Sequence, residues 1–389
     1  MIKLSEPYVH KNDLKFIKKI FLSKKFTDGY YQNKTEKLIK SLIKAKFVAL
    51  TQSCTDALEA ACLLINFKVN DEVLIPSYTF TSTANPFVMR GAKPVFVDIQ
   101  RNNLCMDLND LEKKISKKTK AICVVHYGGQ SCDMDRLIQI KKKYNLFLIE
   151  DAAHAFLGKY NNKYLGTFGD IGVFSFHETK NFVGGQCGAI VVNNAKYLNK
   201  IDIILDKGTD RKKITNYKNH FLVKKKNSFY SWKGVGSEYR ATEISSALLL
   251  TQLNKRFIIQ LKRKLLWHDY YNFLKGINKK LFTLVVQNKK IISSYHLFVL
   301  IFKKEDTASL FVNYLQKKKI AATFHYVPLH SSSFGRSLTK NNLKLPVTEE
   351  IYKKVIRIPL HPNIKVFQKN KIKKVILEFF SKNDFKQQQ

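Results

Sequence analysis

The sequence has little acidic charge and no long apolar segment. Only 30 aspartates and glutamates accompany 68 lysines and arginines, which gives a formal net charge of +38. No apolar run approaches the roughly 20 residues needed to cross a bilayer, and a leading candidate, Ala57–Phe67, is too short. Met1–Glu6 lacks the basic stretch and apolar core of a secretory signal. We therefore expect a cytoplasmic protein without a membrane partner.

Cysteine is also scarce, and its spacing excludes two kinds of cross-linked structure. The six cysteines form no CxxC pair, and several lie in apolar segments; they are Cys54, Cys62, Cys105, Cys123, Cys132 and Cys187. Free thiols usually pack in such segments, whereas a disulfide or zinc framework needs paired spacing. We expect neither a disulfide framework nor a metal site.

The positive charge raises the question of a nucleic-acid partner. Lysine supplies nearly all of it, in short runs such as Lys141–Lys143 and Lys317–Lys319 that are scattered over the chain. Nucleic-acid surfaces favour localised stripes that include arginine and aromatic residues. We interpret the lysines as solvated faces and expect no nucleic-acid partner, although a positive field would attract a diphosphate-bearing substrate. A non-catalytic, basic nucleic-acid-binding protein remains an alternative.

Short β-rich apolar runs alternate with helical patterns through the first two-thirds of the chain. This alternation predicts an α/β fold with a mostly parallel sheet and crossover helices. Strands are expected at 47–50, 73–76, 95–97, 122–125, 146–149, 173–176 and 189–192, and a helix at 55–64. Several strands end at polar side chains, namely Thr51-Gln52-Ser53, Asp98, His126 and Glu150-Asp151. Ligands bind at the carboxyl ends of strands in such sheets, so we expect these residues to share one crevice.

The pattern becomes helical from Tyr239 to about Leu274, which predicts one long helix between two domains. The remainder predicts strands at 295–302 and 320–324 and helices at 309–315 and 371–380. We divide the chain into a large α/β domain, 1–253, and a small α+β domain, 254–389.

Asp151 and Lys180 are the most informative pair of residues. Asp151 follows one strand and Lys180 follows a later one. A buried carboxylate needs a cationic partner, such as a protonated pyridine nitrogen. A lysine beside apolar strands has a lowered pKa, which suits it to form a Schiff base. Taken singly, Asp151 is better explained as a helix cap or a member of a surface ion pair, and Lys180 as a solvated lysine. Together the two residues favour pyridoxal 5'-phosphate (PLP) chemistry.

Two further groups fit a cofactor with a phosphate and a flat ring. Ser53-Cys54-Thr55 lies where a strand meets a helix, and exposed backbone N–H groups there form a phosphate cradle. An ordinary N-cap is the alternative. Ser175 adds a possible phosphate contact, and Phe80 offers an aromatic face for stacking, with core packing as its alternative.

At these residues the chain resembles the DegT/StrS family of sugar aminotransferases. The resemblance runs over nearly the full length. It rests on Asp28-Gly29, TQSCTDAL (51–58), DEVLIPSYTFTSTANPFVMRGAKPVFVD (71–98), VHYGGQSCDMD (125–135), IEDAA (149–153), FSFHETKN (174–181) and TFHYVPLH (323–330). FSFHETKN together with PSYTFTSTAN is highly specific.

The resemblance implies the aspartate-aminotransferase-like fold, PLP fold type I: a mostly parallel sheet with helices on both faces, and a smaller C-terminal α+β domain. It implies that Lys180 carries PLP and that Asp151 pairs with the pyridine nitrogen. The phosphate would be held by Cys54, Thr55 and Ser175, Phe80 would stack on the ring, and His154 and His177 would lie near the cofactor. Tyr326 and His330 would lie near the sugar or the amino donor. It also implies a homodimer with active sites between the subunits.

The implied reaction is transamination of a nucleotide-linked keto sugar by L-glutamate, serving polysaccharide biosynthesis. Within the family the chain most resembles members that form dTDP-4-amino-4,6-dideoxygalactose, which implies dTDP-4-keto-6-deoxy-D-glucose as substrate. GDP- or UDP-linked 4-keto sugars, 3-keto sugars and cyclitols remain alternatives. A sugar dehydratase on this fold goes with loss of the lysine, so Lys180 argues against it.

The chain departs from the family pattern at three places, and at one of them Ser53-Cys54-Thr55 replaces the commoner Ser-Gly-Thr. The family's Glu-Gly-Gly reads Gln186-Cys187-Gly188 here, and the Cβ of Cys187 narrows the backbone choices. Glu238 replaces an asparagine that in many members reaches the other subunit's PLP phosphate. Because an anion facing a phosphate is unfavourable, we expect Glu238 to point away or the contact to be lost.

Overall fold

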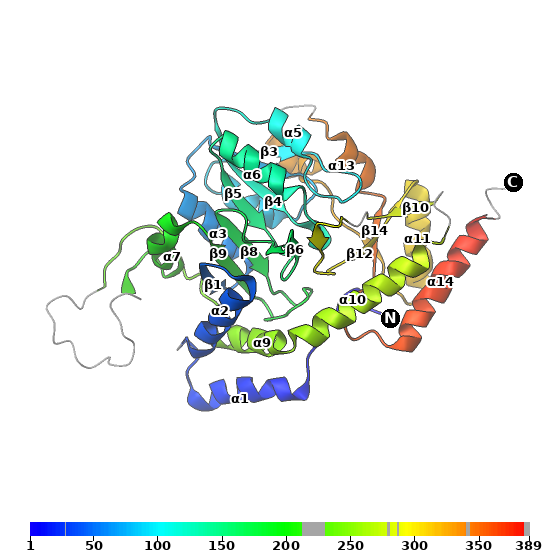
Figure 1. Cartoon of the computed structure of the whole chain (residues 1–389), viewed down its shortest axis with the longest axis horizontal. Helices are drawn as coiled ribbons and strands as arrows, with labels where there is room; N and C mark the ends of the chain where they lie inside the picture. The colour runs from blue at the N-terminus through cyan, green and yellow to red at the C-terminus, as the bar shows by residue number, and fades with distance from the viewer. Residues whose placement is uncertain (28, 212–229, 278–280, 286–287, 340–342, 385–389) are drawn as a thin grey trace.

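A seven-stranded sheet forms the centre of the larger part of the molecule (Figure 1). This computed structural model describes residues 1–27, 29–211, 230–277, 281–285, 288–339 and 343–384, so Asp28 lies outside the described residues. The strands are β1 (Phe47–Thr51), β2 (Glu72–Pro76), β3 (Lys93–Val97), β4 (Thr119–Val125), β5 (Phe147–Asp151), β8 (Ile171–Ser175) and β9 (Gly188–Val192). Their order is β1-β9-β8-β5-β4-β2-β3, and only β9 runs against the others. The mostly parallel sheet is confirmed.

Helices cover both faces of this sheet, as predicted. They are α2 (Tyr30–Ile43), α3 (Cys54–Ile65), α4 (Asn85–Val88), α5 (Leu108–Lys113), α6 (Met134–Lys143) and α7 (Leu198–Leu205). The first helix, α1 (Leu14–Ser23), packs instead beside α2, where Ile20 and Tyr31 share a small apolar cluster. Successive strand residues point to opposite faces. Leu74 and Ile122 pack in a cluster with side chains of α5 and α6, whereas Val73 and Ala121 pack in a second cluster with α3. Burial on both faces explains why the strands read as continuous apolar runs.

A four-stranded antiparallel sheet forms the second core. It contains β10 (Phe282–Leu284), β12 (Phe298–Phe302), β14 (Val355–Ile358) and β13 (Thr323–Phe324), in that order. Its apolar cluster includes side chains of α10 (Arg256–Leu274), α11 (Glu305–Lys317) and α14 (Val366–Asp384). Ile2 joins this cluster and bridges Ile320, so the N-terminus lies beside the C-terminal part of the chain (Figure 1).

Shorter elements connect the two sheets. A small sheet contains β11 (Ile291–Ile292), β6 (Lys159–Tyr160) and β7 (Lys163–Tyr164). The helices α12 (Ser333–Ser337) and α13 (Pro346–Ile351) precede β14.

The predicted long helix is two helices. α9 (Glu243–Asn254) ends where Lys255 adopts φ −96° and ψ 10°, and α10 begins at Arg256. Lys255 donates from Nζ to Asp13 in the N-terminal segment. The local hydrophobic pattern cannot predict such a long-range contact. The predicted strand 295–302 begins only at Phe298, since Tyr295 has a φ of +52°. The domain boundary after Leu253 stays a prediction.

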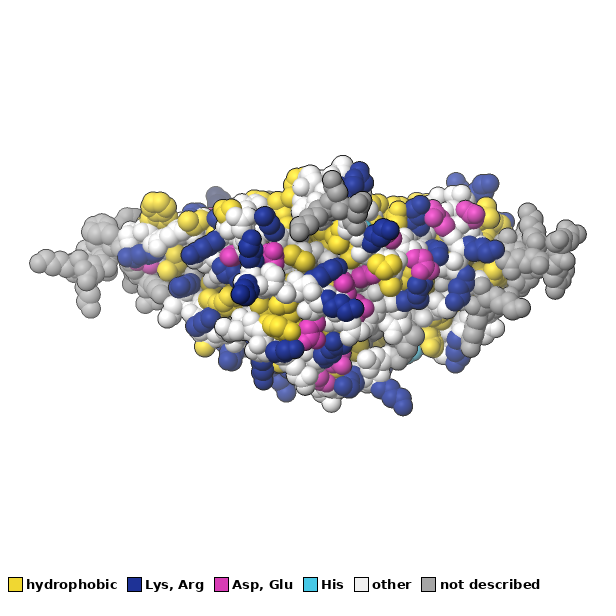
Figure 2. All heavy atoms as spheres, turned by 90° about the horizontal axis from the view of Figure 1, so that it is seen from above, with side chains coloured by type: hydrophobic (Ala, Val, Ile, Leu, Met, Phe, Trp, Pro, Cys, Tyr) yellow, Lys and Arg dark blue, Asp and Glu magenta, His cyan; other side chains and the backbone are white. Residues whose placement is uncertain are grey.

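The lysines are spread over the surface. Figure 2 shows Lys and Arg side chains dispersed over one face, between hydrophobic and a few acidic groups, without a single stripe. Within the described ranges, no helix is long and apolar enough to span a membrane. The cytoplasmic location stays a prediction.

Candidate active site

The carboxyl ends of β5 and β8 and the turn from β1 into α3 open onto one cavity of about 760 Å³. The four-stranded sheet supplies part of the cavity wall through β14. Its lining includes nearly every site residue expected from the sequence: Cys54, Thr55, Phe80, Asp151, His154, Ser175, His177, Lys180 and Tyr326. Residues from widely separated parts of the chain therefore meet at the sheet edge, where α/β folds bind ligands.

Asp151 is buried at the end of β5 and is held by two donors. Thr83 donates from Oγ1 to Oδ2 at 2.8 Å, and the backbone N–H of Ala153 donates to Oδ1 at 3.1 Å. Thr83 was not among the predicted site residues, although it lies in segment 71–98, three residues after Phe80. These bonds fix the carboxylate at the cavity wall.

Lys180 lies in the turn that follows β8, where its backbone N–H donates to the carbonyl of His177 at 2.9 Å. Burial lowers the pKa of Lys180 to about 8, against the opposing effects of Cys54 and Asp151. The lowered pKa increases the fraction of Lys180 that is neutral near neutral pH, and the neutral amine is the form that attacks an aldehyde.

The N-terminus of α3 faces the same cavity. Ser53 caps the helix by accepting from the backbone N–H of Asp56 at 3.1 Å, and its hydroxyl donates to Oδ2 of Asp56 at 2.8 Å. Thr55 donates from Oγ1 to Ser82 at 2.8 Å. Burial raises the pKa of Cys54 well above its usual range, so the thiol is neutral. The N-cap is present, whereas the phosphate cradle at this helix N-terminus stays a prediction.

Gly188 allows β9 to approach this turn. A Cβ built on Gly188 would lie 2.4 Å from the carbonyl carbon of Ser53 and 2.5 Å from the backbone nitrogen of Cys54. No side chain fits there, so the shape of the cradle depends on this glycine.

Three buried histidines lie together beside Lys180. The rings of His154 and His296 are 4.4 Å apart, and His325 stacks on Tyr326 at 4.1 Å. Burial lowers the pKa of His325 to about 2 and those of His154 and His296 well below the usual value, and the charge of Lys180 adds to each effect. The histidines are therefore neutral hydrogen-bonding and packing groups.

Two of these histidines were missed by the sequence analysis. His325 lies inside the quoted segment 323–330, so a signal was available. His296 lies in the short connection between β11 and β12, where its Nδ1 is 2.9 Å from Oδ1 of Asn181, and no local pattern marks it.

His330 and several strand-end residues lie elsewhere. His330 is buried, with Nδ1 2.6 Å from Oγ of Ser77 and Nε2 3.2 Å from Oε1 of Glu349, so both ring nitrogens are engaged away from the cavity lining. Asp98 binds the backbone N–H groups of Val347 and Thr348.

His126 and Glu150 likewise have structural roles outside the cavity. They pair at 2.9 Å, and Glu150 also accepts from the backbone N–H groups of Gly166, Phe168 and Gly169. The expectation that every polar strand end shares one crevice is wrong for Asp98, His126 and Glu150.

The departures from the family pattern at Gln186-Cys187 and at Glu238 have different surroundings. Gln186 and Cys187 line the cavity, and burial raises the pKa of Cys187 to about 12. Glu238 forms an ion pair with Lys207 at the surface.

The fold and the lysine site together define an enzyme of the aminotransferase class. The model of the DegT/DnrJ/EryC1/StrS aminotransferase family matches residues 7–379. The chain belongs to this family, as the quoted segments predicted, and this membership argues against the alternative of a non-catalytic nucleic-acid-binding protein.

Similar proteins include enzymes named for two kinds of nucleotide sugar. GDP-perosamine synthase of Escherichia coli O157:H7 is 30% identical, over 91% of this chain and 91% of that protein. UDP-4-amino-4,6-dideoxy-N-acetyl-beta-L-altrosamine transaminase of Helicobacter pylori is 30% identical, over 97% of each chain. The solved structure of Helicobacter pylori PseC, an aminotransferase involved in the biosynthesis of pseudoaminic acid, is 29% identical and matches with a TM-score of 0.87 over 98% of this chain and 99% of that chain.

Proposed function

We propose that this protein is a PLP-dependent transaminase that transfers the amino group of L-glutamate to a nucleotide-linked keto sugar. One observation carries the proposal: Lys180 with a lowered pKa, the buried carboxylate of Asp151 and the N-terminus of α3 line a single cavity. A lysine of this kind beside a carboxylate and an anion cradle is the combination that PLP requires.

The donor set fits each part of the cofactor. Asp151 accepts from Thr83 and a backbone N–H, which fixes its carboxylate at the cavity wall and suits it to pair with a protonated ring nitrogen. The α3 N-terminus with Thr55 suits the phosphate. Phe80 is 58% exposed although it lines the cavity, so its ring is available to a flat partner.

Each of the cavity residues would have a separate role in the reaction. When bound, PLP supplies an electron sink that stabilises negative charge on the carbon bonded to the transferred nitrogen. Lys180 would hold the cofactor through Nζ and, once the amino donor has taken its place, would carry a proton to and from that carbon. Asp151 would hold the proton on the ring nitrogen, and Phe80 and His154, which line the same cavity, would help to orient the ring.

For the sugar substrate we propose dTDP-4-keto-6-deoxy-D-glucose, with dTDP-4-amino-4,6-dideoxy-D-galactose as the product. The resemblance of the quoted segments supports this choice. The relatives named for GDP- and UDP-linked sugars support the corresponding 4-keto sugars as alternatives.

The test combines purified protein, PLP, L-glutamate and one keto sugar at a time. We expect a visible absorption band with PLP, its loss on addition of glutamate, and an aminated nucleotide sugar with the dTDP substrate. Product only from a GDP- or UDP-linked sugar would replace the dTDP assignment, and activity that survives Lys180→Ala would reject the mechanism.

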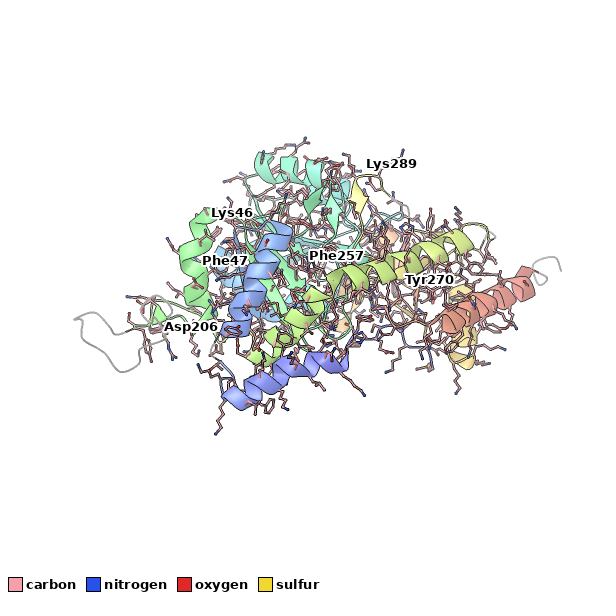
Figure 3. All side chains as sticks on the ribbon, turned by 60° about the horizontal axis from the view of Figure 1, so that its bottom comes forward. Lys46, Phe47, Asp206, Phe257, Tyr270 and Lys289 are labelled. Atoms are coloured by element: carbon pink, nitrogen blue, oxygen red, sulfur yellow. The ribbon has the colours of Figure 1, made fainter. Side chains whose placement is uncertain are left out.

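We also propose a homodimer. Phe257, Leu261 and Leu265 are 74%, 50% and 61% exposed and lie four residues apart on one face of α10. Tyr270, on the same helix, is buried in the second core; Figure 3 labels Phe257 and Tyr270. An exposed apolar stripe of this kind suits a subunit interface.

A further inference from the structure

A second cavity lies at the edge of the seven-stranded sheet opposite the candidate active site. It has a volume of about 720 Å³, and its lining includes Lys46 before β1, Asp170 before β8 and Asn193 after β9. β1 and β8 both run against β9, so these residues mark the edge where the parallel strands begin. Figure 3 labels Lys46. Because a strand of this length spans roughly 17 Å, the two cavities are separate sites.

Lysines dominate the lining of this second cavity, which we call the basic basin. Its charged side chains are Lys44, Lys46, Lys141, Lys159, Lys163 and Asp170. On the face seen in Figure 2 the cations are dispersed among acidic groups, whereas five lysines share the basin with one acid among the described residues. A concave surface lined by one sign of charge concentrates the field, so the basin attracts anions.

The acid of the basin is already engaged by the protein. Asp170 is buried and accepts from the backbone N–H of Leu148 at 2.9 Å and from Nδ2 of Asn194 at 3.0 Å. It also pairs with Nζ of Lys141 at 2.9 Å. Across the described residues, no ion pair is found for the other four lysines of the basin, so their charge is left to a ligand.

Aromatic rings of the basin hold two of these lysines in place. Nζ of Lys159 lies 4.5 Å from the ring centroid of Tyr164, and Nζ of Lys163 lies 4.6 Å from that of Phe168. Both rings line the basin. The attraction between an ammonium group and a ring face restricts these long side chains, so less conformational entropy is lost when an anion binds.

Helix ends explain only part of the positive charge. Lys44 follows α2 directly, and Lys141 lies in the last turn of α6, where a cation complements the helix dipole. Lys159 and Lys163 stand instead on the strands β6 and β7, where no helix dipole acts. Their place beside the basin therefore needs another explanation.

We propose that the basic basin binds a compact polyphosphate anion through Lys46, Lys159 and Lys163. An ammonium group offers three N–H donors and a point charge, which suits phosphate oxygens that approach from several directions. The volume of about 720 Å³ lies within the range of roughly 300–1,000 Å³ that is typical of small-molecule sites. A chain of phosphates meets several ammonium groups at once, which a single phosphate cannot do. This binding site is separate from transamination.

The test is a calorimetric titration of the PLP-loaded protein with inorganic triphosphate at fixed ionic strength. PLP first fills the phosphate site proposed in the catalytic cavity. We expect one triphosphate per chain, weaker binding at higher salt, and binding of inorganic monophosphate that is weaker by roughly tenfold or more. Lys46→Glu combined with Lys163→Glu, both at exposed positions, should raise the triphosphate Kd roughly 30-fold or more.

A matched variant controls for the change in net charge. Lys303→Glu combined with Lys304→Glu alters two exposed lysines before α11 and should keep the triphosphate Kd within about threefold of wild type. Equal losses in the two double variants, or an unchanged Kd in the basin variant, overturn the proposal. If the basin variant does not fold, Lys159→Met and Lys163→Met carry the same test, each with a loss of roughly tenfold.

Two further ligands identify the source of the phosphates. A nucleoside triphosphate that binds like inorganic triphosphate supports a site that contacts only the phosphate chain, and tighter binding supports a nucleotide as the ligand. Duplex DNA that binds more tightly than either, and loses this affinity in the basin variant alone, would assign the basin to nucleic acid and overturn the compact anion. None of these measurements needs turnover, so their outcome is independent of the proposed function.

Discussion

The hydroxyl of Thr83 donates to Oδ2 of Asp151 at 2.8 Å, joining the segment after β2 to the end of β5. Thr83 also lies 2.8 Å, Oγ1 to Oγ1, from Thr79, and all three side chains are buried. The chain thus fixes the carboxylate with a neutral donor, which keeps its charge available for a cationic ligand.

Thr83→Val is therefore expected to weaken PLP binding by roughly 10- to 100-fold, because a hydrogen bond to a charged group is worth about 1.5–3 kcal/mol. A spectral titration of apoprotein with PLP measures the change. The exposed Thr81→Val, two residues earlier, should bind PLP like wild type. Equal affinities for Thr83→Val and wild type would show that the bond does not position Asp151.

The lowered pKa of Lys180 predicts a stability effect with a definite pH window. The folded pKa is about 8 and the ordinary value is 10.5, so the folded state penalises the protonated amine. The penalty is full below pH 8, shrinks as pH rises, and vanishes above about 10.5. Lys180→Met should stabilise the apoprotein by about 1–3 kcal/mol at pH 7 and abolish transamination.

Denaturant titrations at pH 7 and pH 10 measure this difference. The stabilisation by Lys180→Met should be smaller at the higher pH, while Lys303→Met, which alters an exposed lysine, should show no such trend. A difference that grows with pH would contradict the assigned direction.

Gly188→Ala tests the cradle at the α3 N-terminus. The added Cβ would meet backbone atoms of Ser53 and Cys54 at about 2.5 Å, which forces the turn to move. We expect destabilisation of about 1–3 kcal/mol and a marked loss of PLP affinity. Thermal unfolding and PLP titration measure the two effects.

Gly276→Ala is the matched control, since a Cβ there has no neighbour within 4 Å. If Gly188→Ala bound PLP normally, the cradle would not depend on this close approach.

The sequence predicted the central sheet well because each strand is a continuous apolar run buried on both faces. It also predicted which loops reach the cavity, since Asp151 and Ser175 end strands whose direction was implied by the α/β pattern. The break at Lys255 could not be predicted, because it coincides with a contact to Asp13 that is distant in the chain.

The polar residues at the strand ends show a second limit of prediction from the sequence. Asp98 and Asp151 look alike in sequence, yet Asp98 binds backbone N–H groups of residues 347 and 348 while Asp151 faces the cavity. His330 was expected near the substrate, but Ser77 and Glu349 engage its ring. Only the long-range packing of the C-terminal segment distinguishes a structural role from a functional one at these positions.

The apolar face of α10 leads to the last prediction. Phe257→Glu combined with Leu261→Glu places two charges on an exposed stripe, so neither change should disturb the core of the monomer. If this stripe lies in the subunit interface, the dimer dissociation constant should rise roughly 30-fold or more. Sedimentation velocity over a range of protein concentrations measures the shift. Leu310→Glu on α11, which is 57% exposed, should leave assembly unchanged. Because the family pattern implies active sites between subunits, transaminase activity should fall together with the dimer. A double variant that remains dimeric and fully active would place the interface elsewhere.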